Sequence, residues 1–341
     1  MTLTALGTPS GEAAADRPPA VEVTGLVKTF DEVEAVRGID LSVRGGELFG
    51  FLGPNGAGKS TTIKILCTLL RPTAGTARVA GFDVVRDRTE VRRHIGLVFQ
   101  ETTLDDHLTA EQNLRFHADI YGMPRAEVRP RIDVVLEMVG LTDRRASLVR
   151  TFSGGMKRRL EIARGLLHSP RVLFLDEPTI GLDPESRASL WRYVDRLRAE
   201  EDITVFLTTH YMDEAERCDR IAIVDAGRIG ALDTPSALKA SVGHDRVRVV
   251  TTDDDAAEAL VRERLGVETE REGGALVVLT PDGEQFVPRL FELGLTVRSV
   301  SVSRPTLDDV FLAYTGARMA DRQAAAGRSP MVAAMSRGGR R

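Results

Sequence analysis

The fold class of this chain is decided by the stretch Gly53-Pro54-Asn55-Gly56-Ala57-Gly58-Lys59-Ser60-Thr61. The apolar run 47–52 before it predicts a buried strand, and residues 62–70 after it predict the opening of a helix. A glycine-rich turn between a strand and a helix points backbone N–H groups at an anion, and the helix N-terminus adds partial positive charge. Lys59 can reach the outer phosphates and the Ser60 hydroxyl can hold magnesium, so the stretch predicts a site for a nucleoside triphosphate.

The composition favours a soluble globular protein. Hydrophobic residues make up 42% and charged residues 28% of the 341 positions, which is ordinary for folded domains. The formal net charge of −4 gives no general attraction to nucleic acid or to an anionic membrane. No apolar run approaches the roughly 18 residues of a membrane span. Cys67 and Cys218 are too few for a disulfide framework, which favours a reducing, cytoplasmic setting.

The pattern along the chain predicts two folded domains. Residues 21–235 alternate strand-like and helical segments, which is typical of an α/β domain with a mostly parallel sheet. Within them, residues 102–165 show helical patterns and no convincing strand, so we expect an inserted helical subdomain there. Residues 240–315 mix strand-like and helical segments and predict a small α+β domain.

The two ends of the chain differ from these domains in composition. Residues 1–20 contain prolines and glycines but lack the basic and apolar regions of a signal peptide, so we expect a disordered leader. Residues 317–341 form a basic tail, with six arginines against the single Asp321. Disorder is the favoured interpretation of this tail, and attraction to an anionic membrane surface is the alternative.

A second motif lies at residues 171–178, an apolar strand that ends in the adjacent carboxylates Asp176 and Glu177. The carboxyl edge of a parallel sheet lies beside the phosphate loop, so both side chains are expected near the triphosphate. Asp176 is suited to hold magnesium, and Glu177 is suited to polarise an attacking water as general base. An ordinary strand end with solvated acids is the weaker interpretation, because the phosphate loop precedes this strand in the expected order.

A third motif lies between the other two. The turn Ser153-Gly154-Gly155 opens a helix and offers a second anion-binding N-terminus. Such turns are common helix starts, so the turn alone is weak evidence. Residues 152–156, which read Phe-Ser-Gly-Gly-Met, resemble the signature sequence of ABC-type ATPases, which usually has Leu first and Gln last.

Further positions match this family in order. Phe30 matches the aromatic residue that stacks on adenine, and Gln100 matches the glutamine that contacts magnesium and the lytic water. The segment 181–183 matches the one that couples two nucleotide sites, so Asp183 is grouped with the nucleotide-binding residues. His210 matches the histidine that contacts the γ-phosphate. Each residue alone would be ordinary, but their joint order over residues 21–235 makes the resemblance specific.

The resemblance implies an α/β P-loop ABC ATPase fold, ATP and Mg²⁺ as ligands, and a head-to-tail dimer with a second copy of the chain. Two ATP molecules would be sandwiched, each between the phosphate loop of one copy and Ser153, Gly154 and Gly155 of the other. Closure of the dimer would complete the charge stabilisation. It would be transmitted to a membrane permease through the helical block and the segment after Gln100.

Departures from the family pattern narrow the resemblance. Met156 in place of Gln, the basic run 157–159, the segment 179–184 and the segment 304–312 resemble bacterial drug-export ATPases of the daunorubicin/doxorubicin-resistance type. Such ATPases are separately encoded and pair with a permease. We therefore expect a peripheral protein on the cytoplasmic face of the membrane that powers drug efflux and confers antibiotic resistance. Exporters of lipids, polysaccharides or ions share parts of these traits and stay open as alternatives.

Two other functions also stay open. A soluble ABC protein acting on nucleic acid or the ribosome is one, although translation-factor relatives carry two cassettes and repair relatives insert coiled coils or zinc modules. Neither pattern is present here, so no nucleic-acid partner is expected. A regulatory subunit whose hydrolysis reports on a ligand is the other. The cargo, the export direction and the role of residues 240–315 do not follow from the sequence.

Overall fold

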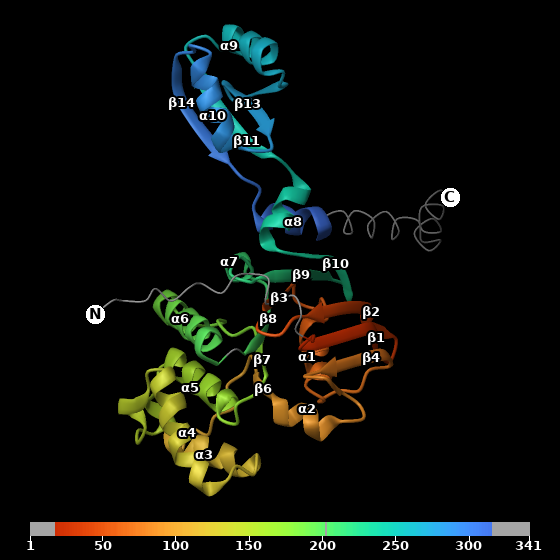
Figure 1. The fold of residues 1–341 in the computed structure, drawn as a ribbon, viewed down its shortest axis with the longest axis vertical. Coiled ribbons are helices and arrows are strands. Elements are labelled where there is room, and N and C mark those ends of the chain that lie inside the picture. Colours follow the sequence, from red (N-terminus) through yellow and green to blue (C-terminus); the bar gives the residue numbers. More distant parts are fainter. Residues whose placement is uncertain (1–17, 202, 316–341) are drawn as a thin grey trace, which may run out of the picture. The chain divides into compact units, whose positions relative to one another are not determined.

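Two units make up the chain, Met1–Leu232 and Asp233–Arg341 (Figure 1). The computed structural model describes residues 18–201 and 203–315. The expected leader, apart from residues 18–20, and the expected basic tail therefore lie outside the described residues. Within those two ranges, no helix is long and apolar enough to cross a membrane.

A six-stranded sheet forms the centre of the first unit. In spatial order its strands are β10 (Arg228–Asp233), β9 (Arg220–Asp225), β3 (Leu48–Leu52), β8 (Thr204–Thr209), β7 (Val172–Asp176) and β6 (Ile95–Val98). Neighbouring strands from β9 to β6 pair in parallel, so their carboxyl ends meet at one edge. The ring of Phe206 packs against those of Phe49, Phe51 and Phe174 with centroids 5.4 to 5.6 Å apart. The expected α/β fold with a mostly parallel sheet is confirmed.

The first two strands belong to a separate antiparallel sheet, which the sequence pattern did not predict. Its strands are β1 (Val21–Phe30), β2 (Val33–Val43), β4 (Ala74–Val79) and β5 (Phe82–Asp83), in the order β2-β1-β4-β5. Only two residues join β1 to β2, and Asp31 takes a left-handed φ of 49° there. A two-residue connection can only join antiparallel neighbours, since parallel strands need a long crossover.

Four helices of the first unit lie outside the helical block. They are α1 (Lys59–Leu66), α2 (Arg88–His94), α6 (Pro184–Glu201) and α7 (Met212–Ala215). Helix α1 packs between the two sheets, with Ile63 and Leu66 in the same core cluster as Val21 and Phe174. It starts at Lys59, three residues before the expected start at 62, because the glycine-rich loop turns directly into the helix.

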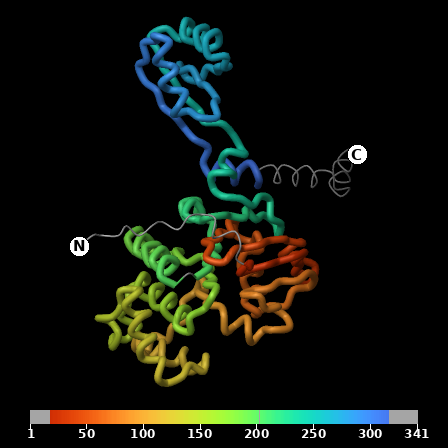
Figure 2. Tube along the Cα trace, viewed as in Figure 1, coloured from red at the N-terminus to blue at the C-terminus, as the bar shows by residue number. Residues whose placement is uncertain are grey.

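The helical block lies to one side of the six-stranded sheet, in the yellow to green part of the trace (Figure 1, Figure 2). It comprises α3 (Ala110–Ile120), α4 (Arg125–Met138), the 3₁₀ turns η1 (Thr142–Arg144) and η2 (Val149–Thr151), and α5 (Gly154–Leu166). No named strand falls within residues 102–165. A capping box opens α3: the Thr109 hydroxyl accepts from the Gln112 N–H at 3.1 Å, and the Gln112 side chain accepts from the Thr109 N–H at 2.8 Å.

The second unit carries a β-α-β-β-α-β arrangement after a first helix. Its elements are α8 (Pro235–Val242), β11 (Asp245–Thr251), α9 (Asp254–Leu260) with the π-helical turn η3 (Val261–Leu265), β12 (Thr269–Glu272), β13 (Ala275–Thr280), α10 (Gly283–Glu292) and β14 (Val297–Ser303). The sheet order β12-β13-β11-β14, antiparallel throughout, is that of ferredoxin-like domains. Val247, Val249, Val278, Phe286 and Leu290 form its core.

Candidate nucleotide-binding site

The glycine-rich loop joins β3 to α1, and its surroundings require glycine at several positions. Gly58 has a φ of 100°, and a Cβ there would lie 2.4 Å from the carbonyl oxygen of Ala35. A Cβ at Gly53 would lie 2.3 Å from the carbonyl oxygen of Val224. Gly56 also has a positive φ, 81°. The chain therefore turns tightly into α1, whose first-turn N–H groups have no helical partners and are available to an anion.

Lys59, the first residue of α1, is buried among oxygen atoms. Its Nζ donates to the carbonyl oxygens of Gly53 at 2.7 Å and Pro54 at 3.1 Å. It also forms an ion pair with Glu177 Oε1 at 3.1 Å. A buried ammonium group needs such partners, because an isolated buried charge is costly. Phosphate oxygens entering the loop would offer partners of the same kind.

Asp176 and Glu177 follow one another at the end of β7, and Thr208 on β8 holds both. The Thr208 hydroxyl donates to Asp176 Oδ1 at 2.6 Å and accepts from the Glu177 N–H at 3.0 Å. The Ser60 hydroxyl also donates to Asp176 Oδ1, at 3.3 Å. The sequence did not predict Thr208 as a site residue. The signal for it is that Thr208 pairs with Asp176 in the sheet, and that register is known only once the strand order is known.

Glu177 has a left-handed backbone with a φ of 48°. Such a conformation costs a non-glycine residue about 1–3 kcal/mol, and it clusters at functional sites. The buried carboxylate lies between Lys59 and His210, whose Nδ1 is 3.5 Å from Glu177 Oε1. That Nδ1 is buried and has no hydrogen-bond partner within the described part of the chain. The ring of His210 is fixed by packing on Tyr211, with centroids 4.1 Å apart.

These elements surround one open cleft of about 430 Å³. Its lining residues are Phe30, Ala35, Asn55, Gly56, Gly58, Lys59, Ser60, Thr61, Gln100 and Glu177. Phe30 comes from the antiparallel sheet, whereas Gln100 follows β6 of the six-stranded sheet. Asp176 and His210 adjoin the cleft through their contacts with Ser60 and Glu177. Ala35 on β2 is the one lining residue that the sequence did not predict. The fold therefore brings distant predicted residues into one cleft.

Known proteins share the sequence of this chain over nearly its whole length. A family model described as ABC transporter matches residues 36–180, and one described as ATP-binding protein DrrA1-3-like, C-terminal domain, matches residues 234–315. The chain is 45% identical to the daunorubicin/doxorubicin resistance ATP-binding protein DrrA of Streptomyces peucetius, over 89% of its own length and 94% of the relative's. It belongs to the ABC transporter ATP-binding proteins. The doxorubicin resistance ATP-binding protein DrrA of Mycobacterium tuberculosis is 38% identical over 87% and 93%.

A solved ABC cassette shares the fold of this ABC protein. The dimeric structure of the cassette MJ0796 bound to ADP and Pi has a TM-score of 0.57 and 28% sequence identity, and covers 63% of this chain and 98% of that one. The chain is therefore an ATP-binding, ATP-hydrolysing protein of a family whose members dimerise and work with membrane permeases. The resemblance to ABC ATPases that the motifs predicted is confirmed.

The other predicted residues of this ABC protein do not line the cleft of their own chain. Ser153 caps α5, with its hydroxyl accepting at 3.2 Å from the N–H three residues later. Gly154 follows with open space around it, and a Cβ at Gly155 would lie 2.3 Å from Ser186 Oγ. Asp183 accepts from the Ser186 hydroxyl at 2.6 Å and from its N–H at 2.9 Å, and these hydrogen bonds lower the pKa of Asp183. One chain thus presents two separate groups of predicted residues.

The oxygen donors beside the loop fit a magnesium ion. Ser60 offers a hydroxyl, Asp176 a carboxylate and Gln100 an amide oxygen, and magnesium prefers such hard ligands. Within residues 18–201 and 203–315, no group of three or more His, Cys, Asp or Glu side chains could hold a metal by itself. Magnesium needs no such cage, because it keeps several waters and binds substrate phosphates. This donor set therefore suits magnesium that arrives with a nucleotide.

Proposed function

We propose that this chain is the ATPase subunit of an exporter, which drives efflux of a drug-like or other hydrophobic compound through a separate membrane permease. One observation carries the proposal: the chain combines an ABC cleft that joins Lys59, Gln100 and Glu177 with a C-terminal domain of the DrrA1-3-like family. Its relatives of similar length are named for resistance to daunorubicin and doxorubicin. The protein would then lie at the cytoplasmic face of the membrane, held there by the permease.

The cleft residues divide the work of hydrolysis. The loop N–H groups and Lys59 hold the phosphates, and Phe30, at the cleft edge, stacks on the adenine. Glu177 accepts the proton of a water whose oxygen bonds to the γ-phosphorus, while the bond from that phosphorus to the β–γ bridging oxygen breaks and ADP leaves. Mg²⁺ held by Ser60, Asp176 and Gln100 would neutralise charge on the phosphate oxygens.

Lys59 links nucleotide binding to the ion pair that occupies the Glu177 carboxylate. Its ammonium group is shared between Glu177, at 3.1 Å, and the loop carbonyl oxygens. A γ-phosphate competes for this ammonium, so its arrival frees the Glu177 carboxylate to face the water. The buried Nδ1 of His210 lies 3.5 Å from the same carboxylate oxygen, so a γ-phosphate that contacts His210 would lie beside the base. Thr208 fixes the backbone that carries it.

The residues outside the cleft complete a second copy's site. Ser153, Gly154 and Gly155 lie at the N-terminus of a 13-residue helix, where free N–H groups and the helix dipole favour a phosphate. Gly155 and Asp183 are joined through Ser186, so the signature turn and the segment 181–183 form one surface. In a head-to-tail dimer each ATP is held by the loop of one copy and the signature turn of the other.

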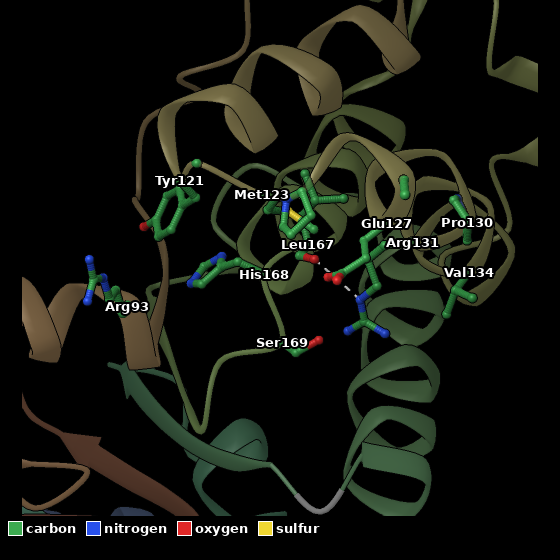
Figure 3. A pocket seen from close by; sticks show the side chains of 13 residues that line it. Arg93, Tyr121, Met123, Glu127, Pro130, Arg131, Val134, Leu167, His168 and Ser169 are labelled. Atoms are coloured by element: carbon green, nitrogen blue, oxygen red, sulfur yellow. Dashed lines mark hydrogen bonds between the residues drawn. The ribbon is translucent and has the colours of Figure 1, made fainter.

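A groove in the helical block is the docking site for the permease (Figure 3). It measures about 660 Å³ and is lined by Arg93 on α2, by residues 121–124 between α3 and α4, by α4 residues from Ala126 to Val134, and by residues 167–169 after α5. Tyr121 stacks on His168 with centroids 3.9 Å apart, and burial lowers the pKa of His168 to about 4, so that ring is neutral at pH 7. The lining combines apolar side chains with Arg93, Glu127 and Arg131, which suits an amphipathic helix of the permease.

Co-expression with a permease that co-purifies with this chain tests the function. We expect the pair to reduce accumulation of a fluorescent amphiphilic drug such as doxorubicin, and the Glu177→Gln variant to abolish the effect. Recovery of the chain in the membrane fraction with a multi-span partner supports transport. Salt-sensitive recovery with ribosomes or DNA, and none with membranes, would favour the soluble alternative instead.

A further inference from the structure

Helix α5 buries a pair of opposite charges that nucleotide contacts do not explain. Arg158 is 6% exposed and Glu161 is fully buried, and the Arg158 Nη1 lies 3.1 Å from Glu161 Oε2. A buried ion pair gains little unless hydrogen bonds satisfy all its polar atoms, because both charges must leave water. The hydrogen-bond partners of the two side chains therefore show which parts of the chain this ion pair fixes in place.

Arg158 binds main-chain oxygen atoms on both sides of Glu177. Its Nε donates to the Pro178 carbonyl oxygen at 2.8 Å, and its Nη2 donates to that of Asp176 at 3.2 Å. Its Nη1 also donates to the carbonyl oxygen of Phe99, the residue before Gln100. One planar guanidinium group thus ties the end of β7 to the start of the Gln100 segment.

Glu161 holds the other end of that segment. Its Oε1 accepts from the Thr103 N–H at 2.8 Å and from the Thr103 hydroxyl at 3.4 Å. Arg164, three residues further along the helix, donates to the Thr103 carbonyl oxygen at 2.9 Å. Gln100 therefore lies on a short segment whose two ends, Phe99 and Thr103, are both bound to α5.

We propose that Arg158 and Glu161 are positioning residues that couple the two halves of the composite site. Ser153 is bound to the partner's nucleotide in the closed dimer, and Arg158 is five residues away on the same helix, roughly 7.5 Å along its axis. A rigid α5 carries any displacement of Ser153 to Phe99, Thr103 and the backbone around Glu177. Engagement of one nucleotide then sets Gln100 and Glu177 around the other. This inference rests on the proposed composite site.

Hydrogen exchange tests the coupling in the full chain carrying Glu177→Gln, which keeps ATP bound. We expect MgATP to slow amide exchange in residues 99–104 of this parent at least about fivefold on dimer formation, because a locally closed segment opens less often. Adding Glu161→Gln keeps the volume and an acceptor for Thr103 but removes the charge. The dimer should still form by gel filtration, while the ATP-dependent slowing in 99–104 is lost.

Two further variants make the result decisive. The neutral double change Arg158→Gln with Glu161→Gln leaves no unpaired buried charge, so it tests the coupling if the single variant fails to fold. Lys157→Gln removes the pair with Asp106, at 2.7 Å, between the same helix and a residue just beyond the segment, and should keep the slowing. ATP-dependent slowing that persists in both pair variants overturns the coupling alone. A parent that forms no ATP-dependent dimer overturns the composite site, and the coupling with it.

Discussion

Among single residues, Glu177 has the geometry expected of a general base whose side chain is already positioned by its neighbours. Its carboxylate contacts Lys59 at 3.1 Å and lies 3.5 Å from His210 Nδ1, on a strained backbone. Glu177→Gln keeps the volume but removes the proton acceptor, so we expect ATP to bind, the dimer to stay closed, and phosphate release to fall at least about 100-fold. Glu137→Gln, on the exposed face of α4, is the control. Unchanged steady-state ATPase activity in Glu177→Gln would rule out the assigned base.

The second prediction at the scale of single residues concerns the hydroxyl group of Thr208. Thr208→Val has nearly the same shape but removes the hydroxyl that donates to the buried Asp176 Oδ1 at 2.6 Å, and a hydrogen bond to a charged group is worth about 1.5–3 kcal/mol. We expect a lower Tm and a lower kcat with little change in KM for ATP, because the base and Asp176 lose their common support. Thr208→Ser should recover most of the kcat. If valine and serine behave alike in a kinetic assay, the hydroxyl has no positioning role.

The residues of the motifs could be predicted from the sequence, but the residues that hold them in place or complete the cleft could not. Gly53 to Thr61, Asp176 and Glu177 are recognisable because residue type, spacing and local strand–helix context agree. Thr208 and Ala35 reach the site only through sheet pairing and packing with residues far along the chain. Sequence spacing carries no information on such contacts, so a threonine in an apolar strand cannot be distinguished from the other threonines of the chain.

On the scale of elements, Glu214 on α7 joins two segments of the site. It is buried and accepts from the hydroxyls of Thr209, at 2.6 Å, and Thr179, which precede His210 and the segment 181–183. Burial raises the pKa of Glu214 above its ordinary 4.5, although both hydroxyls lower it. The folded state therefore holds this proton more tightly than the unfolded state, and stability is lost as the pH rises above 4.5.

The Glu214→Gln variant, whose side chain is neutral at every pH, tests whether ionisation of Glu214 lowers the stability of the fold. Its Tm minus that of the unchanged chain should grow more positive from pH 4.5 towards pH 7, as measured by thermal unfolding. Asp213→Asn, on the same helix but largely exposed, is the control and should show no such trend. A difference for Glu214→Gln that stays constant over this range would show that the carboxyl is not destabilised by burial.

The exposed apolar side chains of helix α3 lead to a prediction about docking of the permease. Phe116 and Ile120, one turn apart, are 62% and 63% exposed on the helix that precedes the groove residue Tyr121. If the permease covers them, Ile120→Asp should lower recovery of the chain with membranes several-fold and leave the ATPase activity of the isolated protein unchanged. Val33→Asp, an equally exposed position on β2, is the matched control. Equal membrane recovery of both variants would place the permease elsewhere.

Elements with a strong pattern were predicted well, and the others depended on their neighbours. The capping box at Thr109 and the buried strands β3 and β7 follow from local sequence. Strand β12 reads Thr-Glu-Arg-Glu and has no apolar alternation, so only its pairing with β13 makes it a strand. The separate antiparallel sheet was missed because strand patterns do not reveal which strands pair.

For the whole molecule, the two groups of predicted residues explain why one copy is insufficient. Lys59 and Glu177 line the cleft, whereas Ser153 and Asp183 lie on the surface formed by the starts of α5 and α6. The proposed twofold dimer would place each surface on the partner's cleft and make two equal sites. In that dimer the loop of one copy would bind ATP, and the other copy would supply further donors to the transition state, each typically worth about 10²–10³ in rate.

Mixing two inactive variants tests this arrangement directly. Lys59→Ala removes a cleft residue and Ser153→Ala removes a signature residue, so each variant alone has no intact site. In a mixed dimer both changes fall on one site, and the other site is intact. Random mixing gives half mixed dimers, so an equal mixture should recover about a quarter of the ATPase activity of the unchanged chain if the sites act independently. Mixing Lys59→Ala with Ser60→Ala, two changes in one loop, should recover none. Equal rates in both mixtures, measured by phosphate release, would mean that each chain hydrolyses ATP with its own residues.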